Sequence, residues 1–422
     1  MVSGSSVGNT VTTGSVTIPM MKKTGYKPEF AGAVEAASST GGQIMPPIMG
    51  AAAFLMAEYM GLPYKDVAVK AILPAVLYFT GIFIAVHLEA KKLGLKGIAR
   101  NELPKWSYLA KNCYLILPLV LLVWLVASGT KTMASSAALS ILAAFVIGFI
   151  HLLTENVQAM KGEGFGKALW ATVKSSVMSA IDALMAGSKG AITVAVACAM
   201  AGMIAGCITV TGLASILINA IVSVAGNATI GGLLLTMICC IILGMGVPTT
   251  ANYCIMAATC APILIQLGFP VVAAHFFVFY FGIVADITPP VALAAYAGSA
   301  IAKSNPMKTG LNATKLAIAA FVVPYIFAYS PEMLFVGEHI TALTVITISV
   351  SALVGLFAIA AALNGHLFKK IPVALRIVLA AGGFGMMIPG ALSDIIGLAV
   401  LVAVVLFQYF TFKKTKAASL PA

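Results

Sequence analysis

Long apolar runs dominate this chain and leave few folds open to it. Hydrophobic residues make up 61% of the 422 positions and charged residues only 9%, against about a quarter in soluble domains. About 20 consecutive apolar residues are enough to cross a bilayer as a helix. Such runs fall at 68–88, 112–128, 134–153, 190–211, 230–247, 270–302, 312–330, 340–363 and 374–412. The sequence therefore predicts an all-α, polytopic membrane protein whose main partner is the lipid bilayer.

The net charge of +12 is explained by loops rather than by nucleic-acid binding, because basic residues in cytoplasmic loops orient a membrane protein. The lysines and arginines gather between the apolar runs, in clusters at 22–27, 91–111, 161–174, 303–315, 369–376 and 413–416. Placing all six clusters in the cytoplasm leaves the loops GLPYKD, SGTKTMAS and YSPEMLFVGEH outside, with almost no positive charge. We expect this topology and no nucleic-acid partner.

No motif indicates catalysis. The five histidines are scattered without HExxH, no Ser/His/Asp set has an interpretable spacing, and the seven cysteines form no CxxC pair. The GMG and GGFG patterns lack the strand and the GK[ST] of a phosphate-binding loop. We therefore expect the chain not to be an enzyme and to hold no cofactor.

Interruptions of the apolar runs recur at a fixed spacing, which indicates an internal repeat. When the sequence is shifted by 243 positions without a gap, 12 of the 58 residues from 9 to 66 are identical. The matches include helix-breaking residues: Asn9 falls on Asn252, Pro19 on Pro262, Gly25 on Gly268, Pro46-Pro47 on Pro289-Pro290, Pro63 on Pro306 and Lys65 on Lys308. We infer two copies of one structural unit.

The loop charges indicate that the two copies run through the membrane in opposite directions. A basic cluster at 22–27 follows the first arm of the first copy, whereas the matching IQLGFP carries no charge. Conversely, Lys303 and Lys308 flank the SNP loop of the second copy, while its counterpart GLPYKD is expected outside. Inverted repeats with helices broken at matching places are typical of secondary transporters, whose binding sites lie near the membrane midplane.

Two segments of each copy are expected to interrupt its helices. SSTGGQIMPP (38–47) and FGIVADITPP (281–290) are predicted to unwind, and VSGSSVGN (2–9) and MGVPTTAN (245–252) to form the tips of re-entrant hairpins. An unpaired backbone group in hydrocarbon costs several kcal/mol, so unwound backbone persists only where protein, water or a ligand satisfies it. Carbonyls at a helix end suit a cation, and amides at a helix start suit an anion. We interpret the breaks as a coordination site.

Three acidic residues lie in or near these segments or in the tail. Asp286 is the best single candidate, because an ionisable side chain at membrane depth usually faces a functional site; it is a cation ligand or proton carrier, or it caps the helix after Pro290. Glu35 either has a function or reaches a polar cavity or a lysine. Asp394 is expected to cap a short helix or turn.

Residues 162–189 have the pattern of an amphipathic helix at the cytoplasmic interface.

These segments resemble the large membrane subunit of tripartite ATP-independent periplasmic (TRAP) transporters, in the fused form paired with TAXI-type binding proteins. The resemblance rests on SGSSVGNTVTTGSVTIPMMKKTGYKPEFAGAVEAASSTGGQIMPPIMGAAAF and on GMGVPTTANYCIMAATCAPIL with ADITPPVALAAYAGSAIA. It extends over residues 1 to about 365, and IPGALSDIIGLAVLV is similar to the C-terminal extension of the fused type. The chain begins at what resembles the first hairpin tip, so we expect an N-terminally truncated fragment.

The resemblance implies an elevator-type transporter in the bacterial inner membrane that imports a small organic anion, such as a dicarboxylate or glutamate. The anion is delivered by a periplasmic binding protein, and the small membrane subunit is fused to the full-length protein. Many relatives carry an acidic residue at the second hairpin tip, where this chain has MGVPTT and, before TPP, Asp286. The resemblance implies Na⁺ as the coupling ion, and this departure from the family pattern leaves H⁺ open.

The resemblance also implies the residues that bind cation and substrate. They lie at the two hairpin tips and in the two unwound segments: Ser3, Gly4, Ser5 and Asn9; Gly246, Pro248, Thr249, Thr250 and Asn252; Ser39, Thr40, Gly41, Gly42, Gln43 and Pro46; and Asp286, Thr288, Pro289 and Pro290. The Na⁺ candidates among them are Gly41, Gly42, Asp286 and Thr288.

The predicted organisation has five parts: the first inverted repeat at 1–93, scaffold helices with the amphipathic helix at 94–228, the second inverted repeat at 229–330, a scaffold helix at 331–365 and a C-terminal membrane hairpin at 366–422. Two alternatives remain open. One is a carrier of the citrate or arsenite type that works without a binding protein. The other is a membrane scaffold or sensor subunit that transports nothing.

Overall fold

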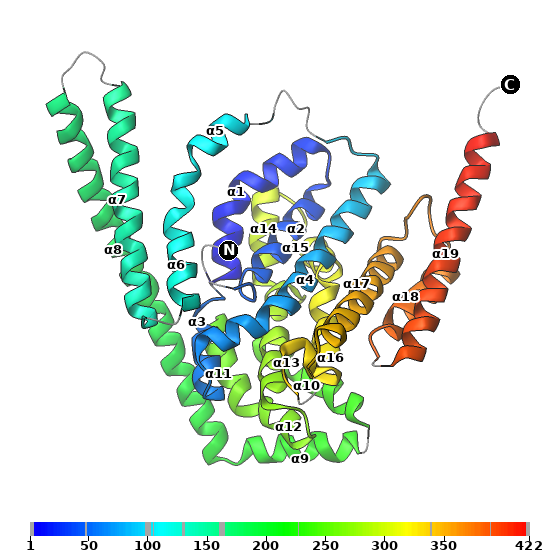
Figure 1. The fold of residues 1–422 in the computed structure, drawn as a ribbon. Coiled ribbons are helices and arrows are strands. Elements are labelled where there is room, and N and C mark those ends of the chain that lie inside the picture. The colour runs from blue at the N-terminus through cyan, green and yellow to red at the C-terminus, as the bar shows by residue number, and fades with distance from the viewer. Residues whose placement is uncertain are drawn as a thin grey trace. The chain divides into compact units, whose positions relative to one another are not determined.

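The described part of the computed structural model contains helices and short turns but no strand (Figure 1). It comprises residues 4–46, 49–97, 103, 105–128, 131–159, 165–226, 228–337, 340–388 and 390–418. The predicted all-α class is confirmed. Contacts divide the chain into two compact units, one made of residues 1–97 with 198–422 and the other of residues 98–197; each is described by itself.

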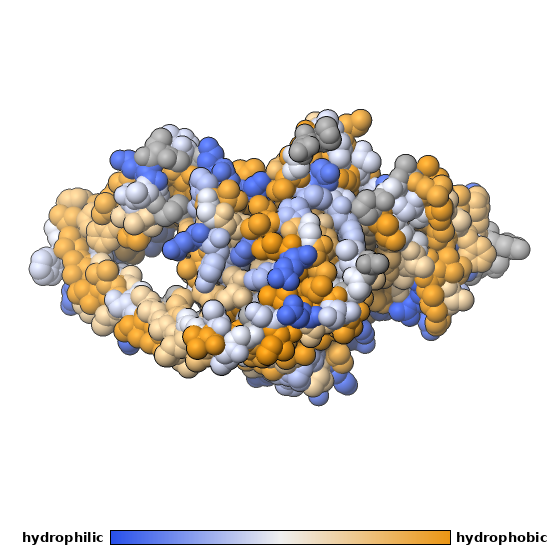
Figure 2. All heavy atoms as spheres, turned by 90° about the horizontal axis from the view of Figure 1, so that it is seen from below, coloured by the Kyte–Doolittle hydropathy of each residue, from blue (hydrophilic) through white to orange (hydrophobic). Residues whose placement is uncertain are grey.

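Five described helices are long and apolar enough to cross a membrane: Tyr64–Leu93, Ala134–Gln158, Pro306–Tyr329, Ala342–Asn364 and Leu392–Lys413. Large apolar side chains remain exposed on them, as with Phe83 at 71% and Leu343 at 75%. On the face seen in Figure 2, apolar side chains cover much of the surface and hydrophilic ones form separate patches. Soluble monomers rarely expose such a surface, so this is a multi-pass membrane protein.

The first copy of the repeat contains four helices: α1 (Ser6–Thr24), α2 (Pro28–Gly41), α3 (Ala51–Met60) and α4 (Tyr64–Leu93). The Ser5 hydroxyl caps α1 by accepting the Gly8 N–H at 3.2 Å, and Gly25 ends α1 with a φ of 111°, a conformation that favours glycine. Proline at the start of α2 removes a backbone donor that no helical bond would use.

The second copy contains α10 (Thr229–Gly244), α11 (Thr249–Thr259), α12 (Ala261–Gln266), α13 (Val271–Val284), the 3₁₀ turn η3 (Ala285–Ile287), α14 (Leu293–Ala302), α15 (Pro306–Leu316) and α16 (Ile318–Tyr329). Under the shift of 243 positions, α2 begins and ends where α13 does, and α1 covers the residues of α11 and α12. The sequence repeat is therefore also a repeat of secondary structure.

The two copies pack reciprocally. α1 contacts α2 of its own copy and α14 of the other, while α11 contacts α13 of its own copy and α3 of the other. Such an exchange of equivalent contacts is what a two-fold relation produces. At the α2–α14 contact the backbones meet at Gly32 and Gly298, since a Cβ on Gly298 would lie 2.6 Å from the Gly32 carbonyl oxygen.

The remaining elements of this unit are α9 (Leu213–Ala225), the 3₁₀ turn η4 (Pro331–Leu334), α17 (Ala342–Asn364), α18 (Val373–Gly385) and α19 (Ala391–Ala418). α18 packs against both α17 and α19. Arg376 caps the end of α17, donating from Nε to the Ala362 carbonyl at 2.6 Å and from Nη2 to that of Leu363 at 3.1 Å. Asp394 lies in the first turn of α19, which is a long helix rather than the short one expected.

The second unit contains α5 (Trp106–Lys111), η2 (Cys113–Ile116), α6 (Leu117–Ser128), α7 (Met133–Ala159) and the first part of α8 (Phe165–Val210). One helix, α8, runs through both the predicted amphipathic segment at 162–189 and the apolar run at 190–211, so no break separates them among the described residues. The only breakers between them are Gly187 and Gly190, and a glycine costs a helix only about 1 kcal/mol. Residues 162–164 lie outside the described residues.

Candidate functional site

The hairpin of the second copy is formed by α10 and α11, joined by a four-residue turn in which Gly246 has a φ of 75°. The 16 residues of α10 span about 24 Å at 1.5 Å per residue, less than the roughly 30 Å hydrocarbon core. This is the geometry of a re-entrant hairpin. In the first copy, Gly4 and Ser5 precede α1 as the corresponding tip, and Ser3 lies outside the described residues.

The first break follows α2. Its end is closed by the Gly42 N–H, which donates to Ser38 and Ser39 carbonyls at 3.2 Å, and by the Gln43 N–H, which donates to Thr40 at 3.1 Å. Pro46 lies in the turn that follows, and Gly50 is the N-cap of α3; residues 47 and 48 are not among the described residues. A Cβ on Gly50 would lie 3.0 Å from the Gly4 carbonyl oxygen, so the hairpin tip rests on the end of this break.

Helix α4 packs against the end of α2, where the first break begins, through Tyr78. The Tyr78 hydroxyl donates to the Ala37 carbonyl at 2.7 Å. The Tyr78 ring also lies so close to α2 that a Cβ on Gly41 would meet its Cε1 atom at 2.4 Å. Glycine at 41 is therefore required by the approach of α4, a role that the sequence did not reveal.

The second break runs from η3 to Ala292, the N-cap of α14. Hydroxyl groups satisfy the carbonyls that this break frees: Thr288 donates to Val284 at 2.8 Å, Thr314 to Ile287 at 3.2 Å and Tyr296 to Pro290 at 2.5 Å. The structure thus meets the requirement for satisfied backbone inside a membrane. Asp286 does not cap α14, because Ala292 occupies that position.

One hydrogen bond joins each hairpin tip to the break of the other copy, and the first of the two is buried. The Ser6 hydroxyl donates to Asp286 Oδ2 at 2.5 Å, and Gln43 Nε2 donates to Thr249 Oγ1 at 2.9 Å. The shift of 243 positions places Ser6 on Thr249 and Gln43 on Asp286. The two bonds are therefore one contact made twice, each joining the first residue of a helix after a hairpin tip to a polar residue at a break.

Near these pairs lie buried oxygens that have no hydrogen-bond partner among the described residues. They include Oε1 of Gln43 and Oδ1 of Asn252. Asn252 is held by a bond from its Nδ2 to the Gly282 carbonyl at 3.0 Å, and Gly244 leaves room for it, since a Cβ there would lie 2.8 Å from Nδ2. A buried acceptor left unpaired costs about 1–3 kcal/mol, and amide oxygens are suitable ligands for a hard cation.

Of the predicted site, the structure pairs Gln43 with Thr249, and it pairs Asp286 with Ser6, which the sequence analysis missed although its register in the repeat equals that of Thr249. Asn252 lies beside this group, in α11. α2 packs against η3. Gly41 and Gly42 lie at the end of α2, and Asp286 and Thr288 lie in and directly after η3, so the two segments that carry the Na⁺ candidates are in contact. The Gly41 carbonyl accepts the N–H groups of Ile44 and Met45.

The other predicted residues lie around these segments rather than in the two bonds. Pro248 is the N-cap of α11, Thr250 is its second residue, Asn9 is buried early in α1, Ser39 and Thr40 lie in the last turns of α2, Gly42 follows it, and Pro289 and Pro290 lie in the second break. Thr40 donates to the Ala36 carbonyl at 3.0 Å, so its hydroxyl is engaged within its own helix.

Glu35 forms a second buried polar group, between α1 and α2. Its carboxylate accepts from the Thr13 hydroxyl and, at 2.5 Å, from the Thr17 hydroxyl, and Ser39 Oγ lies 3.4 Å away. Within the described residues it forms no ion pair, so the sequence alternative of a lysine partner is not what the structure contains. The carboxylate instead fastens α1, the arm after the hairpin tip, to the broken helix.

We expect that replacing both threonines by valine destabilises the protein more than also replacing Glu35. In Thr13→Val/Thr17→Val, the buried carboxylate loses its two closer donors and keeps only Ser39, at about 1–3 kcal/mol for each unsatisfied group. Adding Glu35→Leu removes the stranded group and restores part of the stability. The melting temperature of the detergent-solubilised protein measures this difference. A triple variant that melts at or below the temperature of the double variant would contradict the assignment.

The chain contains two copies of a unit made of a broken helix and a short hairpin. Hydrogen bonds join each copy to the other, and helices with exposed apolar side chains accompany them. These features define a membrane protein of the secondary-transporter class. The family model of the tripartite ATP-independent periplasmic transporter, DctM component, matches residues 1–342. The chain belongs to this family of transporters and is a TRAP transporter permease, as the resemblance at the hairpins and breaks predicted.

The family match ends at residue 342, where α17 begins, rather than near 365 as expected. α18 and α19 therefore lie beyond the matched region. The chain matches no curated protein significantly. As the large component of a tripartite system, a member of this family works with a periplasmic binding protein and a small membrane subunit.

Proposed function

We propose that this permease imports a small organic anion, such as a dicarboxylate or glutamate, across the bacterial inner membrane in symport with Na⁺. We further propose that a TAXI-type binding protein delivers the anion, and that H⁺ is the alternative coupling ion. The observation that carries the proposal is the duplicated bond between hairpin tip and break, Ser6 to Asp286 and Gln43 to Thr249. It joins a polar side chain at each hairpin tip to a polar side chain at the break of the other copy, where a binding site of a transporter with inverted repeats is expected.

In the proposed mechanism the chain's own residues supply three functions. The Asp286 carboxylate and the oxygens of the breaks hold the cation, whose charge then offsets that of the anion. Helix starts such as that of α11 offer N–H groups to the anion. Each hairpin tip closes over the opposite break, so its ordering is coupled to ligand binding. Transport is of the elevator type, with the hairpins and broken helices moving as one body past the scaffold helices.

The test is uptake in proteoliposomes by the permease with its small subunit, using labelled organic acids, with the binding protein present or absent. Sodium and proton gradients are imposed separately. Uptake that requires both the binding protein and a sodium gradient supports the proposal. Uptake driven by protons alone makes Asp286 a proton carrier instead of a sodium ligand. Uptake without the binding protein favours a carrier of the citrate or arsenite type, and a protein without ion-dependent ligand binding would be a scaffold.

A further inference from the structure

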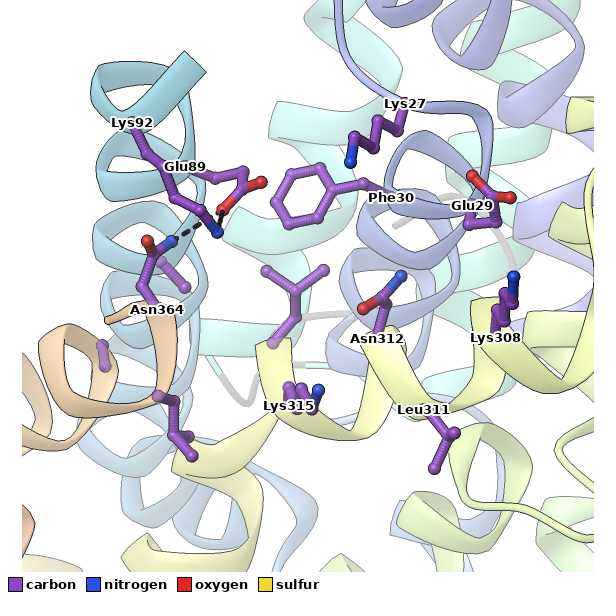
Figure 3. A pocket seen from close by; sticks show the side chains of 14 residues that line it. Lys27, Glu29, Phe30, Glu89, Lys92, Lys308, Leu311, Asn312, Lys315 and Asn364 are labelled. Atoms are coloured by element: carbon purple, nitrogen blue, oxygen red, sulfur yellow. Dashed lines mark hydrogen bonds and ion pairs between the residues drawn. The ribbon is translucent and has the colours of Figure 1, made fainter. Parts of the chain in front are cut away.

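A cavity of about 480 Å³ lies between α2, α4, α15 and α17, away from the helix breaks (Figure 3). None of its lining residues belongs to the hairpin tips or to the unwound segments. It collects side chains from three separate basic clusters of the sequence: Lys27 from the first, Lys92 from the second, and Lys308 and Lys315 from the fourth. This convergence agrees with the prediction that these clusters face the same side of the membrane.

The charges in this cavity do not balance. Four lysines face two glutamates, Glu29 and Glu89. Glu89 is already engaged, because its Oε2 accepts from Lys92 Nζ at 2.9 Å and from Asn364 Nδ2 at 3.0 Å, the two dashed lines in Figure 3. In the described part of the chain, Lys27, Lys308 and Lys315 have no acceptor within hydrogen-bonding distance of their ammonium groups.

The cavity also has apolar walls. Phe30 from α2, Leu311 from α15 and Leu363 from α17 line it beside the ammonium groups. A cationic rim with an apolar wall at the ends of membrane helices is suited to an amphiphilic anion. Basic pockets between transmembrane helices are known to bind the head groups of acidic lipids, and lysine binds phosphate as a point charge.

We propose that this cavity binds a phosphate group, either the head group of an acidic phospholipid or free phosphate, through Lys27, Lys308 and Lys315. The bound phosphate connects the start of α2 with α15, since Lys27 is the N-cap of α2 and Lys308 and Lys315 lie in α15. Binding does not depend on the proposed transport activity. It also differs from substrate binding, because the breaks carry no basic side chain and this cavity carries four.

The test compares ligand-induced thermal stabilisation of the detergent-solubilised chain by phosphatidylglycerol, by phosphatidylcholine and by inorganic phosphate, with native mass spectrometry of bound lipid. The test variant is Lys308→Gln/Lys315→Gln. The matched control is Lys23→Gln/Lys91→Gln, which removes the same charge from the exposed last turns of α1 and α4, outside the cavity. Lys27→Gln tests the rim from a third helix if the double variant does not fold.

Stabilisation by phosphatidylglycerol but not by phosphatidylcholine, weakened about tenfold to thirtyfold in half-saturating concentration by the test variant and unchanged in the control, identifies a lipid head group. Stabilisation by inorganic phosphate with the same dependence on Lys308 and Lys315 identifies free phosphate. Equal weakening in test and control variants would mean general surface charge and would overturn the proposal. Absence of stabilisation by either ligand would overturn it as well.

Discussion

Replacing Asp286 by alanine is expected to lower ion-driven uptake more than 100-fold while the chain still inserts into the membrane. Asp286 is only 7% exposed, and its carboxylate accepts the Ser6 hydroxyl across the two copies. Its removal takes away the proposed cation ligand and leaves Ser6 without that acceptor. A hydrogen bond to a charged group contributes about 1.5–3 kcal/mol, and each 1.4 kcal/mol corresponds to about tenfold, so the loss of this bond together with the proposed cation ligand accounts for the expected effect. Uptake of labelled substrate, normalised to permease in the membrane, measures the effect.

The control is Asp394→Ala, which removes a carboxylate from α19, beyond the family match, and is expected to leave uptake unchanged. The reciprocal variant Thr249→Ala removes the equivalent contact to Gln43 and is also expected to abolish uptake. Asp286→Asn separates charge from hydrogen bonding, since the amide oxygen still accepts from Ser6. Uptake by Asp286→Ala at the wild-type level would refute the site assignment.

The helix breaks were predictable from the sequence because they depend on local chemistry. Prolines and glycines disfavour the continuation of a helix. Single ones are tolerated, as Pro19 is inside α1 and Pro74 inside α4, but GGQIMPP and ADITPP recur 243 positions apart and place their double prolines in register. The ends of α2 and α13 therefore fall where GGQIMPP and ADITPP indicated. The long apolar runs likewise determined the membrane class before any contact was known.

The partners of the site residues were not predictable in the same way. Ser6 bonds to a residue 280 positions away and Gln43 to one 206 positions away, and such contacts depend on how the two copies pack. The repeat register contained part of this information, because it makes Ser6 equivalent to Thr249. It contained nothing about Tyr78, which reaches the first break from α4, nor about the hydroxyls around Glu35, since neither recurs in the other copy.

The α2–α14 contact leads to the second large expected effect: Gly298→Ala destabilises the protein, and Gly298→Leu prevents its folding. A Cβ on Gly298 would lie 2.6 Å from the Gly32 carbonyl oxygen and 3.3 Å from its carbonyl carbon. These are backbone atoms, so no side chain can rotate away and the two helices must separate. Overpacking of this kind costs about 1–3 kcal/mol, occasionally more, and the larger side chain of leucine exceeds what the contact can absorb.

Melting temperature in detergent and the monodisperse fraction in size-exclusion chromatography measure this effect. The control is Gly202→Ala in α8, where an added Cβ meets no atom within 4 Å and where alanine is the better helix former by about 1 kcal/mol. We expect the control to melt no lower than the wild type and Gly298→Ala to melt several degrees below it. Because α2 leads into the first break and α14 out of the second, Gly298→Ala is also expected to reduce uptake by the folded fraction. Equal melting temperatures for Gly298→Ala and the wild type would show that the two broken helices are not held together at this glycine pair.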